Sequence, residues 1–235
     1  MAYAVVVARF NENIDWLRIF DTSSQFRDAK LPASKIPLES KSSVVIYNKG
    51  RMLGDKYKVV TMENKGLEVS AYLRYIVDNY EVLPDVVFFC QGAIHDHVFD
   101  MRQSSIFDKY INLGNNNESQ TWTVGALMNG MNETGRLRFW NGELADAGMN
   151  IEEFFRRFVD DDPAIDLKND FKIYSAAIFS VRRERIRSRP LEFYKRLLEM
   201  PALQAMRPEV AHFFERSWYY IFNCSRPLLT KHKAG

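Results

Sequence analysis

The chain has 235 residues, of which 46% are hydrophobic and 26% are charged, as in an ordinary globular protein. Its net charge of +2 is too small to indicate binding to nucleic acid or to an anionic membrane. Its apolar runs are shorter than the roughly 20 residues of a membrane-spanning helix, and its two cysteines do not suggest a disulfide framework. We therefore expect a cytoplasmic protein in a reducing environment, with no membrane span and no nucleic acid partner.

Three short apolar segments have the pattern of strands that are buried on both faces. They are Tyr3–Ala8, Ser43–Tyr47 and Val86–Cys90. Between the second and the third, Leu67–Tyr80 carries apolar residues at the i, i+3, i+4 spacing of an amphipathic helix. Because strand–helix–strand units with right-handed crossovers build parallel sheets, the first half of the chain predicts an α/β fold.

The second half of the chain has a mixed pattern. Helices are predicted at Val98–Tyr110, Ile151–Val159, Leu191–Met200 and Glu209–Phe222, and strands at Leu137–Trp140 and Lys172–Val181. Pro190 and Pro208 suit the first turns of the last two helices. We expect a single domain over residues 1–235, with a nucleotide-binding half at about 1–112 and a mixed α+β half at about 113–235 that shapes a second ligand site.

A cluster of potential metal ligands follows the third strand. His95, Asp96 and His97 lie just beyond it, and ligands of open α/β sheets bind beyond the carboxyl ends of the strands. Imidazole and carboxylate groups suit Mn²⁺, Zn²⁺ or Fe²⁺, and a carboxylate also suits Mg²⁺ with a diphosphate. The alternative is that Asp96 caps the helix that begins near Val98, while both histidines face solvent.

The acidic run Asp160–Asp162 contains a D-x-D sequence, which many nucleotide-sugar transferases use to hold a metal. In this chain the run ends an amphipathic helix and precedes Pro163, whereas the metal motif is expected after a buried strand. We interpret the run as a solvated helix terminus and expect it to be dispensable for activity.

The last predicted helix presents a polar face. His212, Glu215, Arg216 and Tyr219 are spaced to share that face, beside an apolar stripe. One interpretation is a surface ion-pair face. The other makes Glu215 a general base toward an acceptor hydroxyl and places Arg216 near a phosphate.

Upstream of this helix, residues 182–189 contain five arginines. We expect most of them to be solvated, and one or two of them to offset the charge of a leaving diphosphate.

Several segments, in the same order along the chain, resemble one family. They are VVVARFNENIDWL, VIYNKG, the G-x-E of Gly66–Glu68 with AYLRYIVDNY, LPDVVFFCQG with the following H-D-H, and AAIFSVRRERIRSRPLEFYKRLL with HFFERSWYYIF. Together they resemble a glycosyltransferase-like family with a GT-A type fold, found in fungi and in large DNA viruses of algae. The resemblance covers most of the chain. It implies a GT-A-like fold with a Rossmann-like half, and transfer of a sugar from a UDP- or GDP-sugar donor to a glycan or other hydroxyl acceptor.

The resemblance also implies roles for individual residues. The donor site would include Ala8, Arg9 and Asn11 after the first strand, together with Glu68, Gln91, Gly92, Arg182 and Arg216. The metal, Mn²⁺ or Mg²⁺, would be held at His95, Asp96 and His97, which stand in place of a strict D-x-D, and Glu215 would be the catalytic base. Two other functions stay open: a metal-dependent hydrolase that uses the H-D-H cluster, and a sugar- or nucleotide-binding module without turnover.

Overall fold

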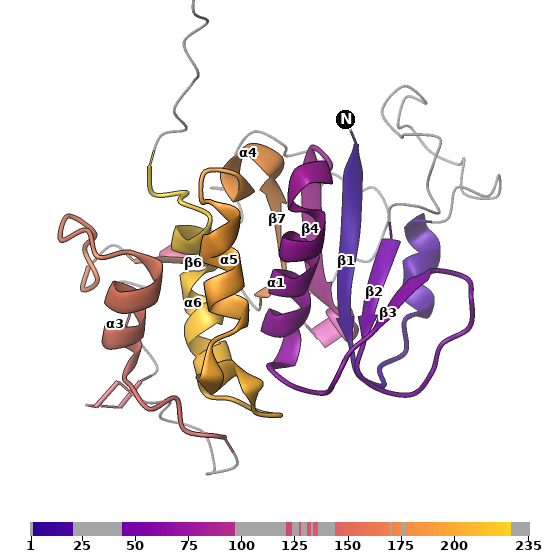
Figure 1. The fold of residues 1–235 in the computed structure, drawn as a ribbon, viewed down its shortest axis with the longest axis horizontal. Coiled ribbons are helices and arrows are strands. Elements are labelled where there is room, and N and C mark those ends of the chain that lie inside the picture. Colours follow the sequence, from indigo (N-terminus) through magenta and orange to yellow (C-terminus); the bar gives the residue numbers. More distant parts are fainter. Residues whose placement is uncertain are drawn as a thin grey trace, which may run out of the picture.

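The computed structural model describes residues 2–20, 44–96, 121–123, 127, 131–132, 134–135, 144–169, 171–174 and 177–226. A five-stranded sheet with the order β3-β2-β1-β4-β7 forms its centre (Figure 1). The strands are β1 (Tyr3–Arg9), β2 (Val44–Asn48), β3 (Lys58–Thr61), β4 (Val86–Gln91) and β7 (Phe179–Arg182). The α/β class predicted from the apolar runs is therefore confirmed.

The strands of this sheet are parallel except for β7 at one edge. Val7 of β1 pairs with Ile46 of β2 on one side and with Cys90 of β4 on the other, whereas Phe89 of β4 pairs with Phe179 of the antiparallel β7. The chain passes from β1 to β2 and β3 on one side of β1, and then crosses over to β4 on the other side. In open α/β sheets, the carboxyl ends of the strands at such a reversal form the usual ligand crevice.

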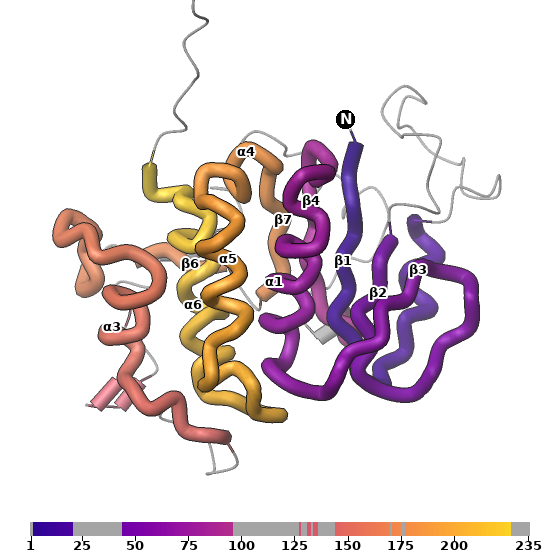
Figure 2. Tube along the Cα trace, in the orientation of Figure 1, coloured from indigo at the N-terminus to yellow at the C-terminus, as the bar shows by residue number. Residues whose placement is uncertain are grey.

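Both faces of the sheet are covered, and Figures 1 and 2 show the face on which most of the helices lie. Helices α1 (Leu67–Asn79) and α6 (Val210–Ile221) pack on one face and α5 (Leu191–Leu198) packs against α1, while the short 3₁₀ helix η1 (Asp15–Phe20) covers the opposite face. Alternate residues of β1 supply both cores, because side chains alternate along a strand. Val6 joins the core under the helices, and Val5 and Val7 join the core under η1.

Helix α6 is anchored by aromatic packing. Trp218 is fully buried, and its ring lies 5.9 Å from that of Tyr72 on α1, 5.5 Å from that of Phe179 on β7 and 5.6 Å from that of Phe222, measured between ring centroids. Large buried rings of this kind contribute much of the apolar area of a core. The aromatic stripe therefore fixes α6 against α1 and the sheet, and with it the orientation of the polar face of α6.

The second half of the chain departs from the prediction at one strand. The apolar segment Lys172–Val181 forms two strands in different sheets: β6 (Lys172–Tyr174) pairs with β5 (Thr121–Thr123), whereas β7 belongs to the main sheet. Between them Ala177 has a φ of 54°, a left-handed conformation that L-residues rarely adopt. The predicted single strand is therefore wrong.

The remaining elements are short. They are the helical turns η5 (Tyr80–Val82), η6 (Ile94–Asp96) and η11 (Pro201–Gln204), helix α4 (Arg183–Ile186), and α3 (Ile151–Phe154), which continues into the π-helical turn η9 (Phe155–Val159). The helix predicted at Ile151–Val159 is thus confirmed. The predicted helix at Val98–Tyr110 and strand at Leu137–Trp140 lie outside the described residues.

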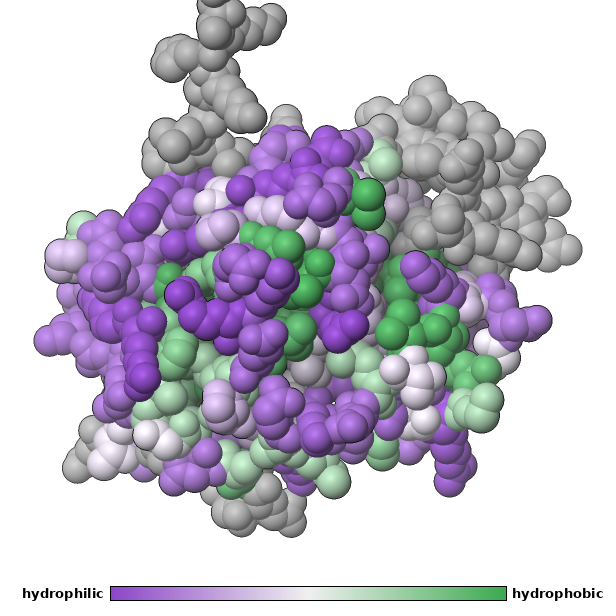
Figure 3. All heavy atoms as spheres, viewed as in Figure 1, coloured by the Kyte–Doolittle hydropathy of each residue, from purple (hydrophilic) through white to green (hydrophobic). Residues whose placement is uncertain are grey.

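Both cysteines, Cys90 and Cys224, are free and buried. Within the described ranges, the helices are too short or too polar to cross a membrane. On the face shown in Figure 3, hydrophobic patches are separated by hydrophilic side chains.

Candidate functional site

The loops that follow β1 and β2 are bound tightly to each other. Arg9, at the end of β1, is 9% exposed, and its Nη1 donates to Asn48 Oδ1 at the end of β2 at 2.7 Å. Its guanidinium also donates to the backbone carbonyls of Glu12, Phe10 and Arg51, at 2.9, 3.1 and 3.2 Å. The structure therefore places Arg9 inside the turn, where it joins the two loops.

Asn11 and Gly50 complete this junction. Asn11 Oδ1 accepts a hydrogen bond from the backbone N–H of Arg51 at 2.9 Å. A Cβ atom at Gly50 would lie 1.6 Å from the carbonyl oxygen of Phe10. No side chain larger than a hydrogen atom fits there, so the close approach of the loops requires glycine at residue 50.

The turn after β4 lies against the same edge. The N–H of Gly92 donates to Ala8 O at 2.8 Å, and Gly92 O accepts from Nε1 of Trp16 at 2.9 Å. The carboxylate of Glu12 lies so close that a Cβ at Gly92 would be 2.8 Å from its Oε2. Ala8, Gln91 and Gly92 are therefore brought together at the carboxyl ends of β1 and β4, as the sequence predicts for neighbouring strands.

The proposed metal motif is only partly described. His95 lies on η6 with its side chain exposed, Asp96 is the last residue of η6, and His97 lies outside the described residues. In the part of the chain that the structure describes, no group of three His, Cys, Asp or Glu residues is placed to hold a metal ion. Because His97 and the side chain of Asp96 lie outside what the structure describes, the metal site at this motif stays a prediction.

A second group of polar residues meets at this edge from three elements. Glu68 lies in the first turn of α1, Lys49 directly follows β2, and His212 and Glu215 lie on α6. The pKa of Glu68 is raised to about 7, mainly by burial and also by the charge of Glu215, while a backbone hydrogen bond and the charges of His212 and Lys49 act in the opposite direction. Charge effects on a pKa act over several ångströms, so these four groups, which we call the carboxylate cluster, lie together.

Glu215 has a specific neighbour in this cluster. His212 Nδ1 lies 3.6 Å from Glu215 Oε2, and the two side chains are 19% and 36% exposed.

Arg216 follows Glu215 on α6. Burial lowers the pKa of Arg216, and the charge of Glu215 opposes that shift. The Arg216 guanidinium makes no hydrogen bond or ion pair with any residue that the structure describes. A partly buried arginine of this kind is suited to binding an anion such as a phosphate.

The carboxylate cluster can transfer protons. A carboxyl group with a pKa near 7 is poised to gain and lose a proton at neutral pH. Two neighbouring carboxyl groups in different environments are a common arrangement for acid–base chemistry. Sequence reasoning identified Glu68 and Glu215 separately but missed Lys49, whose only signal is its place directly after a buried strand.

The arginines of residues 182–189 lie elsewhere. Arg182 pairs with Val86, the first residue of β4, and is therefore separated by the length of that strand from Gln91 and Gly92. Arg187 is exposed and the other four are partly exposed, so most of them reach solvent, but four of them also bind chain atoms. The acceptors are Asp85 for Arg183, Asn223 O for Arg185, Tyr80 O for Arg187 and Asp160 for Arg189.

The acidic run Asp160–Asp162 also differs from the prediction. Asp160 is buried, and its carboxylate binds Arg189 at 3.0 Å and Arg226 at 2.8 Å. Asp162 binds Arg226 at 3.0 Å, and Asp161 is exposed. The interpretation as a solvated terminus is therefore wrong for Asp160. Its ion pairs join the end of η9 to the segments that follow α4 and α6.

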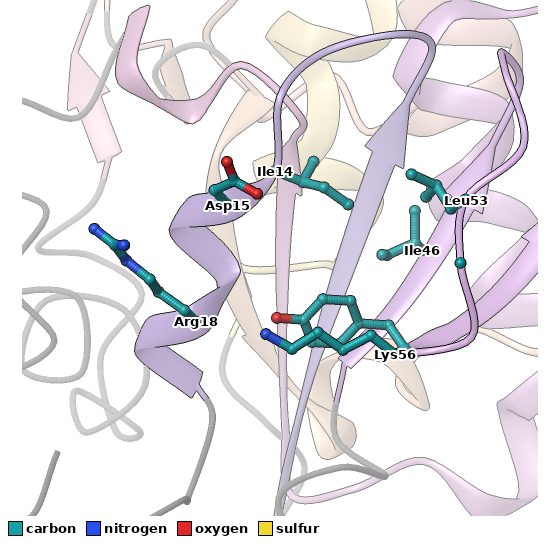
Figure 4. Close-up of a pocket in the computed structure, with 8 residues that line it drawn as sticks. Ile14, Asp15, Arg18, Ile46, Leu53 and Lys56 are labelled. Atoms are coloured by element: carbon teal, nitrogen blue, oxygen red, sulfur yellow. The ribbon is translucent and has the colours of Figure 1, made fainter. Parts of the chain in front are cut away.

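A pocket of about 300 Å³ lies beside β2, on the face covered by η1 (Figure 4). Ile46 and Leu53 form its apolar side, and Asp15, Arg18 and Lys56 carry its charged groups. Its walls are the segments that follow β1 and β2, so it borders the edge at which these strands end. A small apolar pocket with a few polar groups is the usual form of a ligand site.

Comparison with known proteins places the chain in a family. A search of curated proteins finds no significant match. The family model described as "Protein of unknown function (DUF3431)" matches residues 5–233, which is nearly the whole chain. The chain therefore belongs to the DUF3431 family of proteins.

Proposed function

We propose that the protein is a glycosyltransferase of GT-A-like architecture, which moves a sugar from a nucleoside diphosphate sugar to a hydroxyl acceptor. The observation that carries this proposal is the convergence of Glu68, Lys49, His212 and Glu215 at the edge where the parallel strands end. This edge is the ligand-binding edge of open α/β sheets. The sequence resemblance supplies the reaction class, and the strand order is compatible with it.

In the proposed reaction Glu215 is the general base. It removes the proton of the acceptor hydroxyl while the acceptor oxygen forms a bond to the anomeric carbon. The bond between that carbon and the diphosphate oxygen breaks, and its electron pair leaves with the diphosphate. His212, 3.6 Å from Glu215, orients the carboxylate. The guanidinium of Arg216, which has no ion-pair partner among the described residues, offsets the negative charge that develops on the leaving group.

The donor would lie across the ends of β1, β2 and β4. The turns that carry Asn11, Gly50 and Gly92 are packed together by hydrogen bonds and close backbone contacts, which makes this floor rigid. A rigid floor lowers the entropic cost of ordering a ligand. The pocket in Figure 4 offers space for the nucleoside next to this floor. Mn²⁺ or Mg²⁺ at Asp96 would supply charge neutralisation for the diphosphate.

The proposal is tested by incubating the full chain with a panel of UDP- and GDP-sugars, with and without Mn²⁺, and measuring release of the nucleoside diphosphate. Slow release from one donor class is expected, because activated sugars also transfer to water. Binding of a donor without release supports a binding module instead. Metal-dependent cleavage of unrelated esters, with no cleavage of nucleotide sugars, supports the hydrolase.

A further inference from the structure

Lys49 connects the end of β2 to the start of α1. Its backbone N–H donates to Arg9 O at 2.8 Å, which continues the pairing of β1 with β2. Its side chain reaches the segment before α1, where Nζ donates to the carbonyl oxygens of Lys65 and Leu67 and, at 2.6 Å, to Ser70 Oγ. Because an ammonium group has three donors, these acceptors use all of them.

The segment that Lys49 binds, residues 65–67, has an unusual backbone. Gly66 has a φ of 68° and Leu67 a φ of 45°, so two successive residues are left-handed. Residues other than glycine rarely adopt this conformation, and a Cβ at Gly66 would lie 3.0 Å from Leu203 O. Such a backbone persists only where its surroundings hold it. Lys49 supplies two of the contacts that do so, at carbonyl groups on either side of Gly66.

Ser70 connects the same turn to the helix. It is 8% exposed, and its hydroxyl donates to Lys65 O at 2.7 Å while accepting from Lys49. The N–H of Gly66 donates to Ala205 O at 2.8 Å, which joins the turn to the segment before α6. The turn is therefore fixed to β2, to α1 and to the chain that leads into α6.

Glu68 comes directly after this turn. We infer that Lys49 is a positioning residue: by binding the left-handed turn of residues 65–67, it sets the carboxylate of Glu68 beside His212 and Glu215. The importance of this role for turnover rests on the proposed function. The placement itself does not, because it depends on the hydrogen bonds of Lys49, on the order of the residues in α1 and on the packing of α6 against α1.

The inference is tested by titrating Glu68 in protein labelled with ¹³C at the glutamate carboxyl groups, with Glu68→Gln used to assign its signal. Lys49→Met keeps the length of the side chain but removes its charge and its donors. If Lys49 positions Glu68, the carboxylate leaves its partly buried place in this variant, and its pKa falls from about 7 toward its ordinary value of 4.5. If Lys49 acts through its charge alone, the pKa of Glu68 rises, because that charge lowers it. A pKa that rises or stays unchanged overturns the inference.

Two further variants make the test specific. Lys65→Met removes a lysine from the same turn, but its ammonium pairs with Glu63 and lies outside the contacts of Lys49, so the pKa of Glu68 should not change. Ser70→Ala removes one acceptor of Lys49 and should shift the pKa in the same direction as Lys49→Met, by less. Ser70→Ala also decides the question if Lys49→Met fails to fold.

Turnover adds a separate measurement. If the wild-type protein releases nucleoside diphosphate, Lys49→Met should lower turnover at unchanged donor affinity, and Lys49→Arg, which keeps charge and donors, should restore part of it. A wild-type protein without turnover contradicts the proposed function. The carboxyl titration then still decides whether Lys49 positions Glu68.

Discussion

Burial raises the pKa of Glu68 on α1 to about 7, and the carboxylate of Glu215 on α6 adds to the increase. These two residues are far apart in the sequence and meet because the aromatic stripe of α6 packs on Tyr72, one turn beyond Glu68. The same packing that builds the core thus determines the distance between the two carboxylates.

The first prediction concerns the pH dependence of stability. The pKa of Glu68 is raised above its ordinary value of 4.5, so between pH 4.5 and about 7 the folded protein keeps a proton that the unfolded chain has lost. The free energy of unfolding therefore decreases as the pH rises through this interval. Each pKa unit corresponds to about 1.4 kcal/mol. Glu68→Gln cannot ionise, so this decrease in the free energy of unfolding should be absent from the variant. At pH 8 the variant should be more stable than the wild type by about 2–3 kcal/mol.

Thermal or denaturant unfolding at pH 4 and pH 8 measures this difference. At pH 4 Glu68 is protonated in both states, so the wild type and Glu68→Gln should be equally stable. Glu152→Gln, at an exposed position in the first turn of α3, is the matched control and should change little at either pH. A Glu68→Gln protein that is less stable at pH 8 would show that the ionised carboxylate stabilises the fold.

The second prediction compares two glycines of the β2–β3 connection. Gly50→Ala forces a Cβ atom against Phe10 O, whereas a Cβ at Gly54 meets nothing within 4 Å. Gly50→Ala should therefore destabilise the protein by at least about 1–3 kcal/mol and weaken UDP or GDP binding, because the loops after β1 and β2 must separate. Gly54→Ala should leave both properties near the wild type. If both variants bind UDP or GDP equally well in calorimetry, the loop junction is not part of the donor site.

The third prediction concerns the buried acid of the acidic run. Asp160→Asn breaks ion pairs to Arg189 and Arg226 at a side chain that is 3% exposed, and breaking a buried pair typically costs about 3–5 kcal/mol. Asp161→Asn changes an exposed neighbour and should cost less than about 0.5 kcal/mol. Denaturant unfolding of both variants measures this. Nearly equal midpoints would mean that Asp160 contributes no more than a surface carboxylate.

Much of the sheet could be predicted from the sequence. β1, β2 and β4 are continuous apolar runs, and α1 has a clear helical period, so burial and repeat length identify them. β3 was missed because Lys58–Thr61 is a short edge strand whose ends are exposed, and edge strands lack a strong apolar pattern. The break between β6 and β7 was missed because no glycine or proline marks it. The chain turns instead at Ala177, which is left-handed.

The site could be predicted only in part. The polar ends of β1 and β4 follow from the pairing of neighbouring strands, so Ala8 and Gly92 were expected to meet. The direction of β7 cannot be read from its composition, so the sequence does not show that Arg182 lies beside the first residue of β4, away from Gln91. The approach of Glu68 to Glu215 and the contacts of Lys49 depend on how α1 and α6 pack, which no local pattern encodes.

The fourth prediction tests the central claim, that Glu215 is the base of a glycosyl transfer. A well-placed general base contributes roughly 10²–10⁴-fold to the rate. Glu215→Gln keeps the size and hydrogen bonding of the side chain but cannot accept a proton. Turnover of the donor found by the panel assay should fall by about that factor, with little change in donor affinity.

The most direct measurement is therefore the turnover, donor affinity and melting temperature of Glu215→Gln, with Glu209→Gln at the N-cap of α6 as a control for changes to the start of that helix. We predict a folded protein that binds the donor normally and has lost nearly all turnover. Normal turnover with a lowered melting temperature would show that Glu215 is only the ion-pair partner of His212 and would remove it from the mechanism.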